Sequence, residues 1–385
     1  MPWKERSIMM TRKEFVELAL APEANISKLS AQYGISRTCA YKWIDRYKDE
    51  GVVGLLNRKT TPHASPYRTA IQVEDAILEV RSVHPAWGAR KIRAFLLSRG
   101  HAGLPAVSTI TEILRRNGQL DPQESQKHKA FIRFERSQPN ELWQLDCKGY
   151  FQGQAGKIFP LDLIDDHSRY CLCLRAQADI RRFTVQQVLT ETFRTYGLPE
   201  AILCDNGSPW GDSQRFPYTR LGVWLLRLGV QVLHGRPFHP QTQGKLERFH
   251  RTLELEAIRG FPLLDEQWQA HFDRFRWDYN HNRPHEALGL EVPVSRYTPS
   301  PVSFPEVLSP VEFVDSRIVR KVYSPGFIHF QGREIRFSKG FLNQPVCLCP
   351  STDDGCYDVF YGNFKVAVVD MKSEKPTVNY VSERV

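Results

Sequence analysis

Three acidic residues stand where side chains from distant parts of the chain can meet. Asp146 interrupts an apolar stretch that begins at Leu142, Asp205 ends a second apolar run, and Glu247 lies in a polar segment typical of a helix. Two strands and a helix would then deliver one carboxylate each. Because an isolated carboxylate is costly inside a sheet unless something positive meets it, we expect a cation among the three.

Mg²⁺ is the cation that suits these groups. It prefers octahedral oxygen coordination, keeps several waters, and takes one or two protein carboxylates beside phosphate oxygens. Three carboxylates can hold two such ions, with Mn²⁺ as a substitute. Ions about 4 Å apart stabilise both the attacking and the leaving oxygen of a displacement at phosphorus. The predicted chemistry is metal-dependent transfer or hydrolysis of phosphodiesters.

Each acid also has an ordinary explanation when taken singly. An Asp at a strand end commonly forms a turn or caps a helix, and a Glu between Lys245 and Arg248 is commonly a solvated ion-pair partner. Asp162, Asp165 and Asp166 compete with the chosen acids, and for them we favour turn formation. The separations of His239, His250 and His285, 11 and 35 residues, do not suit a compact zinc motif.

The segments around the three acids resemble the catalytic blocks of insertion-sequence transposases in the retroviral-integrase-like superfamily. The matching segments are Trp143–Asp146, Cys204–Ser208 and, with the highest specificity, His239–Leu253. The resemblance is close from Trp143 to Leu288. It implies an α/β ribonuclease-H-like core in which Asp146, Asp205 and Glu247, the DDE triad of the family, are catalytic and bind two Mg²⁺ ions.

Two departures from the family pattern stand out. Between Asp205 and Glu247 lie 41 residues, more than the family's usual spacing, so we expect an insertion that forms a surface loop within 210–220. The chain also lacks the paired His and Cys of the zinc module that precedes retroviral integrase cores. Helix-turn-helix units take its place.

The net charge of +9 is concentrated at the front of the chain. Residues 1–139 carry 23 Lys or Arg against 14 Asp or Glu, and the remainder is neutral. Such a basic arm predicts DNA as a partner, since Lys and Arg release the counterions condensed on DNA.

The eight cysteines form no zinc pattern and are expected to be reduced thiols, with 171/173 and 347/349 each on one face of a strand. No membrane-spanning run or secretory signal is evident, so we expect a cytoplasmic, nucleoid-associated protein.

Residues 1–60 are expected to form a helix-turn-helix domain. A capping box at Thr11 begins the first helix, a second runs from Ile26 to Tyr33, and Ser36 caps a third that ends near Glu50. The helix after the turn enters the major groove in such domains. The predicted DNA contacts are Arg37, Thr38, Tyr41, Lys42 and Arg46. The alternative is a generic three-helix bundle.

Residues 69–120 are expected to form a second, similar unit, with Ser108 capping its last helix. The predicted DNA contacts there are Arg90, Lys91, Ser108, Thr109 and Thr111. The alternative role of this unit is contact with another protomer. In the catalytic core, Lys245 and Arg248 are further candidates for holding the DNA backbone, with solvated surface charges as the alternative.

The rest of the chain divides by composition. A polar linker at 121–140, read as lying along DNA, precedes the core at 141–292, whose order of three hairpin-linked strands, a helix and a strand is that of ribonuclease H. A proline-rich, stiff linker at 293–311 leads to a small β-barrel at 312–370 and a tail at 371–385. The expected fold is therefore multidomain: all-α front units, an α/β core and a C-terminal β-barrel for DNA or subunit contact.

The expected function is a DNA transposase that binds the terminal inverted repeats of a mobile element, cleaves the element ends and joins the 3′ ends to target DNA. The family resemblance implies self-association into a dimer or a larger synaptic complex. Two alternatives stay open. One is a DNA-binding regulator whose nuclease core has decayed, and the other is a metal-dependent nuclease that cuts without joining.

Overall fold

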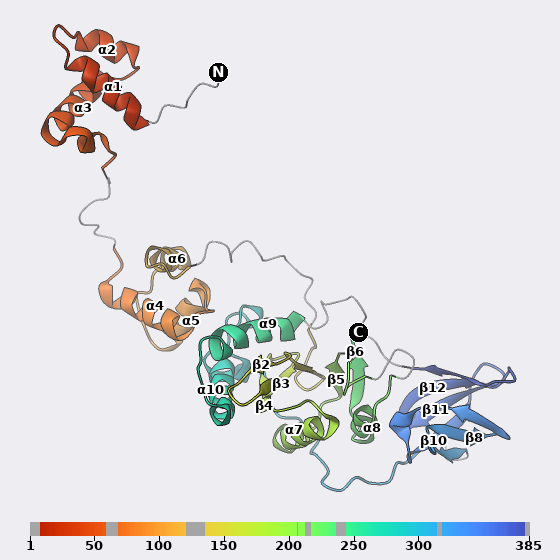
Figure 1. The fold of residues 1–385 in the computed structure, drawn as a ribbon. Helices are drawn as coiled ribbons and strands as arrows, with labels where there is room; N and C mark the ends of the chain where they lie inside the picture. Colours follow the sequence, from red (N-terminus) through yellow and green to blue (C-terminus); the bar gives the residue numbers. More distant parts are fainter. Residues whose placement is uncertain are drawn as a thin grey trace. The chain divides into compact units, whose positions relative to one another are not determined.

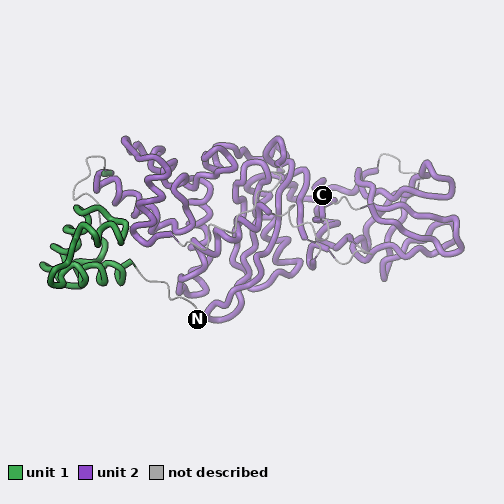
Figure 2. The backbone as a smooth tube through the Cα atoms, turned by 90° about the horizontal axis from the view of Figure 1, so that it is seen from above, with its two compact units in different colours: residues 1–68 green, residues 69–385 purple. Residues whose placement is uncertain are grey.

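The computed structural model describes residues 8–58, 68–120, 135–205, 207–211, 217–235, 244–313 and 318–381. The chain divides into two compact units, Met1–Arg68 and Thr69–Val385 (Figure 2). The boundary coincides with the start of the second helical unit that the sequence predicted at residue 69. Among the described residues, no helix combines the length and the apolar character needed to cross a lipid bilayer.

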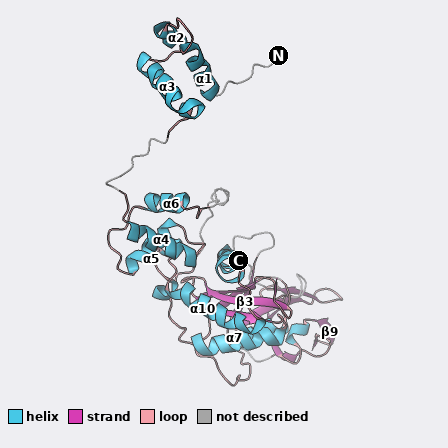
Figure 3. Ribbon diagram, turned by 60° about the vertical axis from the view of Figure 1, so that its left-hand side comes forward, coloured by secondary structure: helices cyan, strands magenta, loops and turns pink. Residues whose placement is uncertain are grey.

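The first unit contains helices without strands among its described residues (Figure 3). The helices are α1 (Ile8–Ala19), α2 (Ile26–Gln32) and α3 (Arg37–Glu50), followed by a 3₁₀ turn at Gly51–Leu55. The predicted cap of α3 is confirmed, since Ser36 Oγ accepts the N–H of Cys39 at 3.2 Å. The predicted start of α1 at Thr11 is wrong, because the helix already includes residues 8–10.

A second group of three helices begins the larger unit. It consists of α4 (Ile71–Val83), α5 (Ala89–Ser98) and α6 (Val107–Arg116), packed around the buried side chains of Ile77, Trp87, Ile92, Ile110 and Leu114. The predicted cap at Ser108 is wrong. The N-cap of α6 is Ala106, without a side-chain hydrogen bond, so Ser108 lies in the first helical turn.

The central sheet has the strand order that positions an acidic site. Its strands are β1 (Leu142–Cys147), β2 (Phe151–Gln152), β3 (Lys157–Asp165), β4 (Cys171–Gln177), β5 (Ala201–Cys204) and β6 (Gln231–His234). β3 lies antiparallel between β1 and β4, whereas β5 runs parallel to both β1 and β6. Antiparallel hairpins on one side of β1 and parallel strands on the other give the ribonuclease-H-like arrangement predicted from the sequence.

Helices cover both faces of this sheet (Figure 1). On one face, α7 (Arg182–Tyr196) and α8 (Arg220–Arg227) pack against alternate residues of β1, including Trp143 and Leu145. On the other face, α9 (Gly244–Leu253) and α10 (Trp268–His281) bury Leu246, Phe249 and Phe272. A π-helical turn at Glu254–Ile258 continues α9. Because strand side chains alternate, β1 turns Gln144 and Asp146 toward the face covered by α9.

A β-bulge corrects one prediction about the cysteines. Leu163 pairs with Cys173 and Ile164 with Cys171, so Leu172 is an extra residue on β4. An extra residue breaks the two-residue alternation of a strand. Cys171 therefore packs on the α9 face and Cys173 on the α7 face, rather than both on one side. All eight cysteines are free thiols, and Cys347 and Cys349 do lie together, with sulfur atoms 3.8 Å apart.

The proline-rich segment is a strap along the core rather than a free spacer. Phe304 stacks on Phe193 of α7, and Arg194 forms an ion pair with Glu306 at 2.6 Å. Gly197, at φ 78°, allows the approach, because a Cβ there would meet two carbonyl oxygens of the strap at 2.7 Å. Apolar and ionic contacts together fix this segment to the catalytic core.

The C-terminal domain is rich in strands but forms no closed barrel among its described residues. The strands are β7 (Val319–Lys321), β8 (Phe327–Phe330), β9 (Arg333–Arg336), β10 (Pro345–Pro350), β11 (Cys356–Tyr361), β12 (Phe364–Asp370) and β13 (Thr377–Tyr380). They form an open five-stranded antiparallel sheet, β13-β12-β11-β10-β7, and a separate β8–β9 hairpin. The barrel prediction is corrected accordingly, and the expected tail contributes β13.

Helix α8 belongs to two cores at once. Leu221 and Leu225 face the central sheet, whereas Val223 and Leu226 pack with the C-terminal strands. The closest approach is at Gly340, where a Cβ would lie 2.4 Å from the carbonyl oxygen of Tyr218. The C-terminal domain is thereby packed directly against the catalytic core.

Candidate active site

Two of the three acids stand at the ends of neighbouring parallel strands. Gln144 of β1 pairs with Leu203 of β5. Continued for two residues beyond that pair, the same register would bring Asp146 opposite Asp205, which directly follows β5. Neighbouring strands lie about 4.8 Å apart. The charge of Asp205 also acts on Asp146, so we expect the two carboxylates to lie near each other.

Burial makes this pair of negative charges costly. It raises the pKa of Asp146 to about 6, and the nearby charges of Asp162 and, more weakly, Asp205 act in the same direction. The pKa of Asp205 is also raised by burial, against the hydrogen bond that its Oδ1 accepts from the N–H of Gly207 at 3.0 Å. Such raised values mark carboxylates that lack a compensating positive charge.

Glu247 lies in the first turn of α9, and its side chain is exposed. Side chains three residues apart share one side of a helix, and His250 on that side contacts Asp162 of β3. Asp162 in turn pairs with Asp146 across the two strands. Glu247 is thus carried on the side of α9 that faces the acidic pair. Among the described residues, no three His, Cys, Asp or Glu side chains lie close enough together to hold a metal ion.

Two ion pairs tie α9 to the sheet. His250 Nε2 lies 2.7 Å from Asp162 Oδ1, whose carboxylate is completely buried. Lys245 Nζ pairs with Asp166, which is also completely buried. Burial lowers the pKa of Lys245 to about 8, although the charge of Asp166 opposes that effect. The pKa of His250 is raised, because the charge and hydrogen bond of Asp162 outweigh the lowering by burial.

The acids that compete with the predicted set have internal partners. Asp165 accepts hydrogen bonds from the backbone N–H groups of Asn140 and Ser168, at 2.8 and 2.7 Å. Asp166 accepts from Gln144 Nε2 at 2.7 Å and from the N–H of Arg136 at 2.9 Å. Asp165 and Asp166 lie at the turn that follows β3, as expected. The expectation of a turn at Asp162 is wrong, because this residue lies within β3. The sequence did not reveal that Asp162 and Asp166 reach across to α9, since no local pattern encodes partners some eighty residues away.

The acidic pair fits a divalent metal ion by its donor chemistry. Asp146 and Asp205 offer oxygen ligands of the kind that Mg²⁺ prefers. Beside them, Oδ2 of Asp162 is buried without a hydrogen-bond partner among the described residues, which is costly unless a ligand or water meets it. The desolvated carboxylates and this orphaned oxygen define a locus of unbalanced negative charge that a cation would relieve.

The predicted DNA contacts of the first unit lie on an accessible face of α3. Arg37, Thr38, Tyr41 and Lys42 are exposed, whereas Trp43 and Ile44 are buried in the unit's core. Arg46 is half-buried, with its guanidinium 5.2 Å from the ring of Trp43. The early residues of α3 are thus accessible to a ligand.

The predicted contacts of the second unit are split between α5 and α6. Ser108 and Thr109 are exposed on α6, and the hydroxyl of Thr111 donates to the carbonyl of Val107 at 2.9 Å. On α5, Arg90 lies 3.9 Å from Glu286, and burial beside Arg283, opposed by Glu256, lowers the pKa of Lys91 to about 8. Lys91 and Lys245 are both half-buried, whereas Arg248 is exposed.

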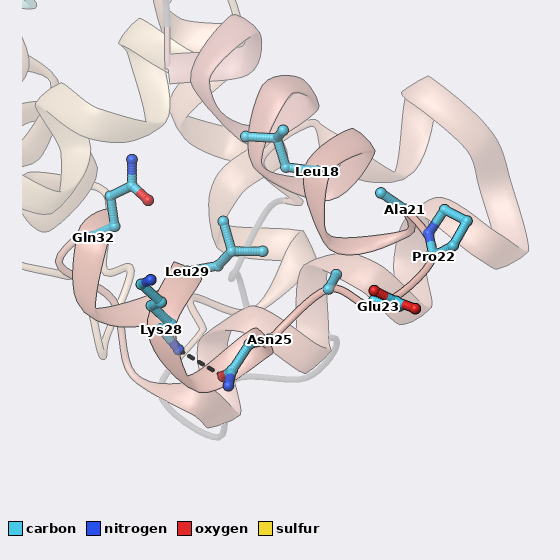
Figure 4. A pocket seen from close by; sticks show the side chains of 9 residues that line it. Leu18, Ala21, Pro22, Glu23, Asn25, Lys28, Leu29 and Gln32 are labelled. Atoms are coloured by element: carbon cyan, nitrogen blue, oxygen red, sulfur yellow. Dashed lines mark hydrogen bonds between the residues drawn. The ribbon is translucent and has the colours of Figure 1, made fainter.

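The pocket in Figure 4 lies in the first unit, and none of the acidic residues of the sheet lines it. It separates the end of α1 from α2, and Leu18, Pro22 and Leu29 line it. Asn25 on its rim accepts the N–H of Lys28 at 3.0 Å and caps α2. We assign it a structural role in the turn between the helices.

Some predicted features lie outside the described residues. These are His239 and the rest of 236–243, residues 212–216 of the insertion expected within 210–220, and residues 121–134 of the linker. Of the expected insertion, Trp210 is described and is buried in the core with α7 and α8. The last linker residues are packed too, since Glu135 pairs with Arg169 at 3.1 Å.

Known protein families match the chain in an order that follows its architecture. Residues 11–63 match a helix-turn-helix domain and 39–114 a homeodomain-like domain. Residues 136–240 and 228–293 match two models of the integrase core domain. Residues 317–377 match the C-terminal domain of the IS481 family transposases.

Individual relatives are distant. The transposase for transposon Tn552 of Staphylococcus aureus is 25% identical over 354 residues, covering 80% of this chain and 71% of that protein. The Gag-Pol polyprotein of baboon endogenous virus (strain M7) is 22% identical over 247 residues. This match covers 63% of this chain but only 13% of the polyprotein. A simian T-cell lymphotropic virus intasome chain, solved in complex with a PP2A regulatory subunit, aligns over 80% of this chain and 96% of its own, with 16% identity and a TM-score of 0.36.

The strand order, the acidic pair at the ends of β1 and β5 and the succession of domain matches agree with one another. The chain is a DDE transposase of the insertion-sequence type, in the retroviral-integrase-like superfamily of polynucleotidyl transferases.

Proposed function

We propose that this transposase binds the terminal inverted repeats of its mobile element, cleaves DNA at the element ends, and joins the freed 3′ ends to target DNA. The observation that supports the proposal is the parallel pairing of β1 with β5, because Asp146 lies near the end of β1 and Asp205 directly follows β5. We assign Glu247 as the third carboxylate, delivered by α9.

Asp146, Asp205 and Glu247 would hold two Mg²⁺ ions. Bound there, the ions would activate the attacking oxygen and neutralise the charge on the leaving oxygen of an in-line displacement. The protein's own contribution is to hold the three carboxylates in place and to keep Asp146 and Asp205 poorly solvated, which strengthens their attraction for a divalent cation. The same site would serve water in the cleavage step and a 3′ hydroxyl in the joining step.

DNA recognition is assigned to the helical units and to the exposed side of α9. Arg37, Thr38, Tyr41 and Lys42 of α3 would read the terminal repeat, with Ser108 and Thr109 of α6 contacting a second part of it. Arg248, one residue after Glu247 and exposed, would hold the backbone near the cut. Because both element ends must be handled together, we propose that the protein acts as a dimer or a larger assembly on DNA.

The test uses the full-length protein and duplexes that carry the inverted repeats found beside its gene. Mg²⁺-dependent nicking at the repeat ends and covalent joining to a second duplex are expected. Glu247→Gln should lower both rates by about 10³-fold, which corresponds to about 4 kcal/mol of barrier. A gel-shift measurement should show unchanged DNA binding by this variant.

Three outcomes would overturn parts of the proposal. Full activity of Glu247→Gln would remove Glu247 from the site. Nicking without joined products would make the protein a nuclease, and repeat binding without Mg²⁺-dependent nicking would make it a regulator.

A further inference from the structure

Two buried polar residues outside the DDE triad link the sheet to the helix that carries Glu247. Asp162 of β3 is completely buried, and its Oδ1 lies 2.7 Å from Nε2 of His250 on α9. The two residues are separated by 88 positions in the chain. This contact is therefore a purely tertiary tie between the two elements.

The tie lies next to the acidic site at both of its ends. Asp162 pairs directly with Asp146 across β3 and β1, so both side chains point to the same face. His250 follows Glu247 by three residues and so shares its side of α9. A movement of His250 relative to Asp162 would shift Glu247 relative to Asp146.

Only one oxygen of Asp162 is used by His250. Oδ2 is buried and has no hydrogen-bond partner among the described residues. A half-satisfied buried carboxylate costs free energy, so a core built for stability alone would favour an apolar pair at these positions. The cost is understandable if the pair sets the geometry of the site.

Packing elsewhere does not set this geometry alone. Leu246, Phe249 and Leu253 hold α9 down on the sheet, but apolar contacts have no direction and allow small shifts along the helix axis. The Lys245–Asp166 pair holds the first turn. The Asp162–His250 pair is the polar contact one turn after Glu247.

We propose that Asp162 and His250 are positioning residues, which fix the distance of Glu247 from the Asp146–Asp205 pair. The inference rests on the proposed function of that triad. Neither residue needs to touch DNA or metal. Partners of this kind around a metal site typically contribute about 10- to 100-fold to metal affinity.

The test compares Asp162→Ala with Asp162→Asn in the full-length protein. Mn²⁺ binding is measured by electron paramagnetic resonance in the absence of DNA, so that the readout does not depend on activity. Asp162→Ala should weaken Mn²⁺ binding about 10- to 100-fold. Asp162→Asn should recover part of that loss, because its amide oxygen can still accept a hydrogen bond from Nε2–H of a neutral His250.

A matched control separates positioning from stability. Arg283 and Glu256 form another buried ion pair, 2.7 Å long, just beyond α9. Glu256→Ala should lower the melting temperature, as Asp162→Ala does, but leave the Mn²⁺ dissociation constant within about twofold of the wild type. A second variant, Asp162→Val with His250→Leu, should regain thermal stability without regaining Mn²⁺ affinity.

Two results would overturn the inference. One is unchanged Mn²⁺ affinity in Asp162→Ala, and the other is recovered affinity in the apolar double variant. Failure of the proposed function looks different, since Glu247→Gln would then bind Mn²⁺ as the wild type does.

Discussion

The acidic face of the central sheet and the outer face of α3 use charge in opposite ways. On the sheet, Asp146 and Asp205 are desolvated, and burial raises the pKa of both. On α3, the cation of Arg37 and the ammonium of Lys42 are exposed to water. Buried charge is costly and becomes useful only when a ligand balances it. Exposed charge costs little, and many such groups can add up to DNA affinity.

This contrast predicts that charge changes on the sheet have larger effects than those on α3. The largest effect is expected from Asp205→Asn, which removes one of two adjacent ligands. Cleavage of repeat DNA in Mg²⁺ should fall by about 10³-fold or more. Repeat binding, measured by fluorescence anisotropy in EDTA, should stay unchanged. A parallel loss of DNA affinity would show that the two regions are not independent.

At Asp146, removal of the negative charge is expected to stabilise the metal-free protein. Its pKa is raised from 3.8 to about 6 by burial in the folded chain, so the folded state binds more protons than the unfolded state between these values. The cost of ionising it is absent below pH 3.8, grows through that window, and is complete above pH 6. Asp146→Asn should therefore stabilise the metal-free protein by about 3 kcal/mol at pH 7.5.

Chemical denaturation in EDTA measures this gain, and a second series at pH 4.5 should show most of it lost. Saturating Mg²⁺ should also reduce it, because the ion stabilises the wild type alone. A destabilised Asp146→Asn at pH 7.5 would mean that the carboxylate already has a compensating partner in the free protein.

A smaller effect is expected on α3. Arg37→Ala should weaken binding to the terminal repeat about tenfold if Arg37 reads a base edge, or lower the slope of log affinity against log salt by about one if it contacts phosphate. Lys13→Ala is the matched control, because Lys13 is exposed on α1 and paired with Glu17 at 3.7 Å. Equal losses of DNA affinity in both variants would indicate that binding depends on the overall positive charge of the unit rather than on recognition by α3.

The smallest effect is expected from Lys91→Met. Lys91 was predicted to contact DNA, but it is largely buried near Arg283 and Glu256. Its removal should change DNA affinity by less than about 0.5 kcal/mol and leave the salt slope unchanged. A salt slope lower by about one would show that the Lys91 ammonium contacts phosphate in the DNA complex. Lys91 would then be a DNA contact, as the sequence predicted.

The cores of the helical units and the central sheet were predictable because their patterns are local. Ser36 caps α3, and short apolar runs mark β1 and β3, since these signals depend on neighbours in the sequence. The C-terminal strands were also recognisable in the sequence, but the prediction that they close into a barrel was wrong. Closure depends on pairing between edge strands, which no single strand encodes, and the described sheet stays open.

The sequence alone determined which residues could do the chemistry: apolar runs that end in Asp146 and Asp205, and a polar helix with Glu247. Tertiary structure decided how they are held. The parallel pairing of β1 with β5 made neighbours of the strands that lead to the two aspartates, and contacts across about eighty residues gave Asp162 and Asp166 their partners on α9. The physical reason is that alternation and capping are fixed by adjacent residues, whereas the partner of a buried charge is chosen only when distant elements pack.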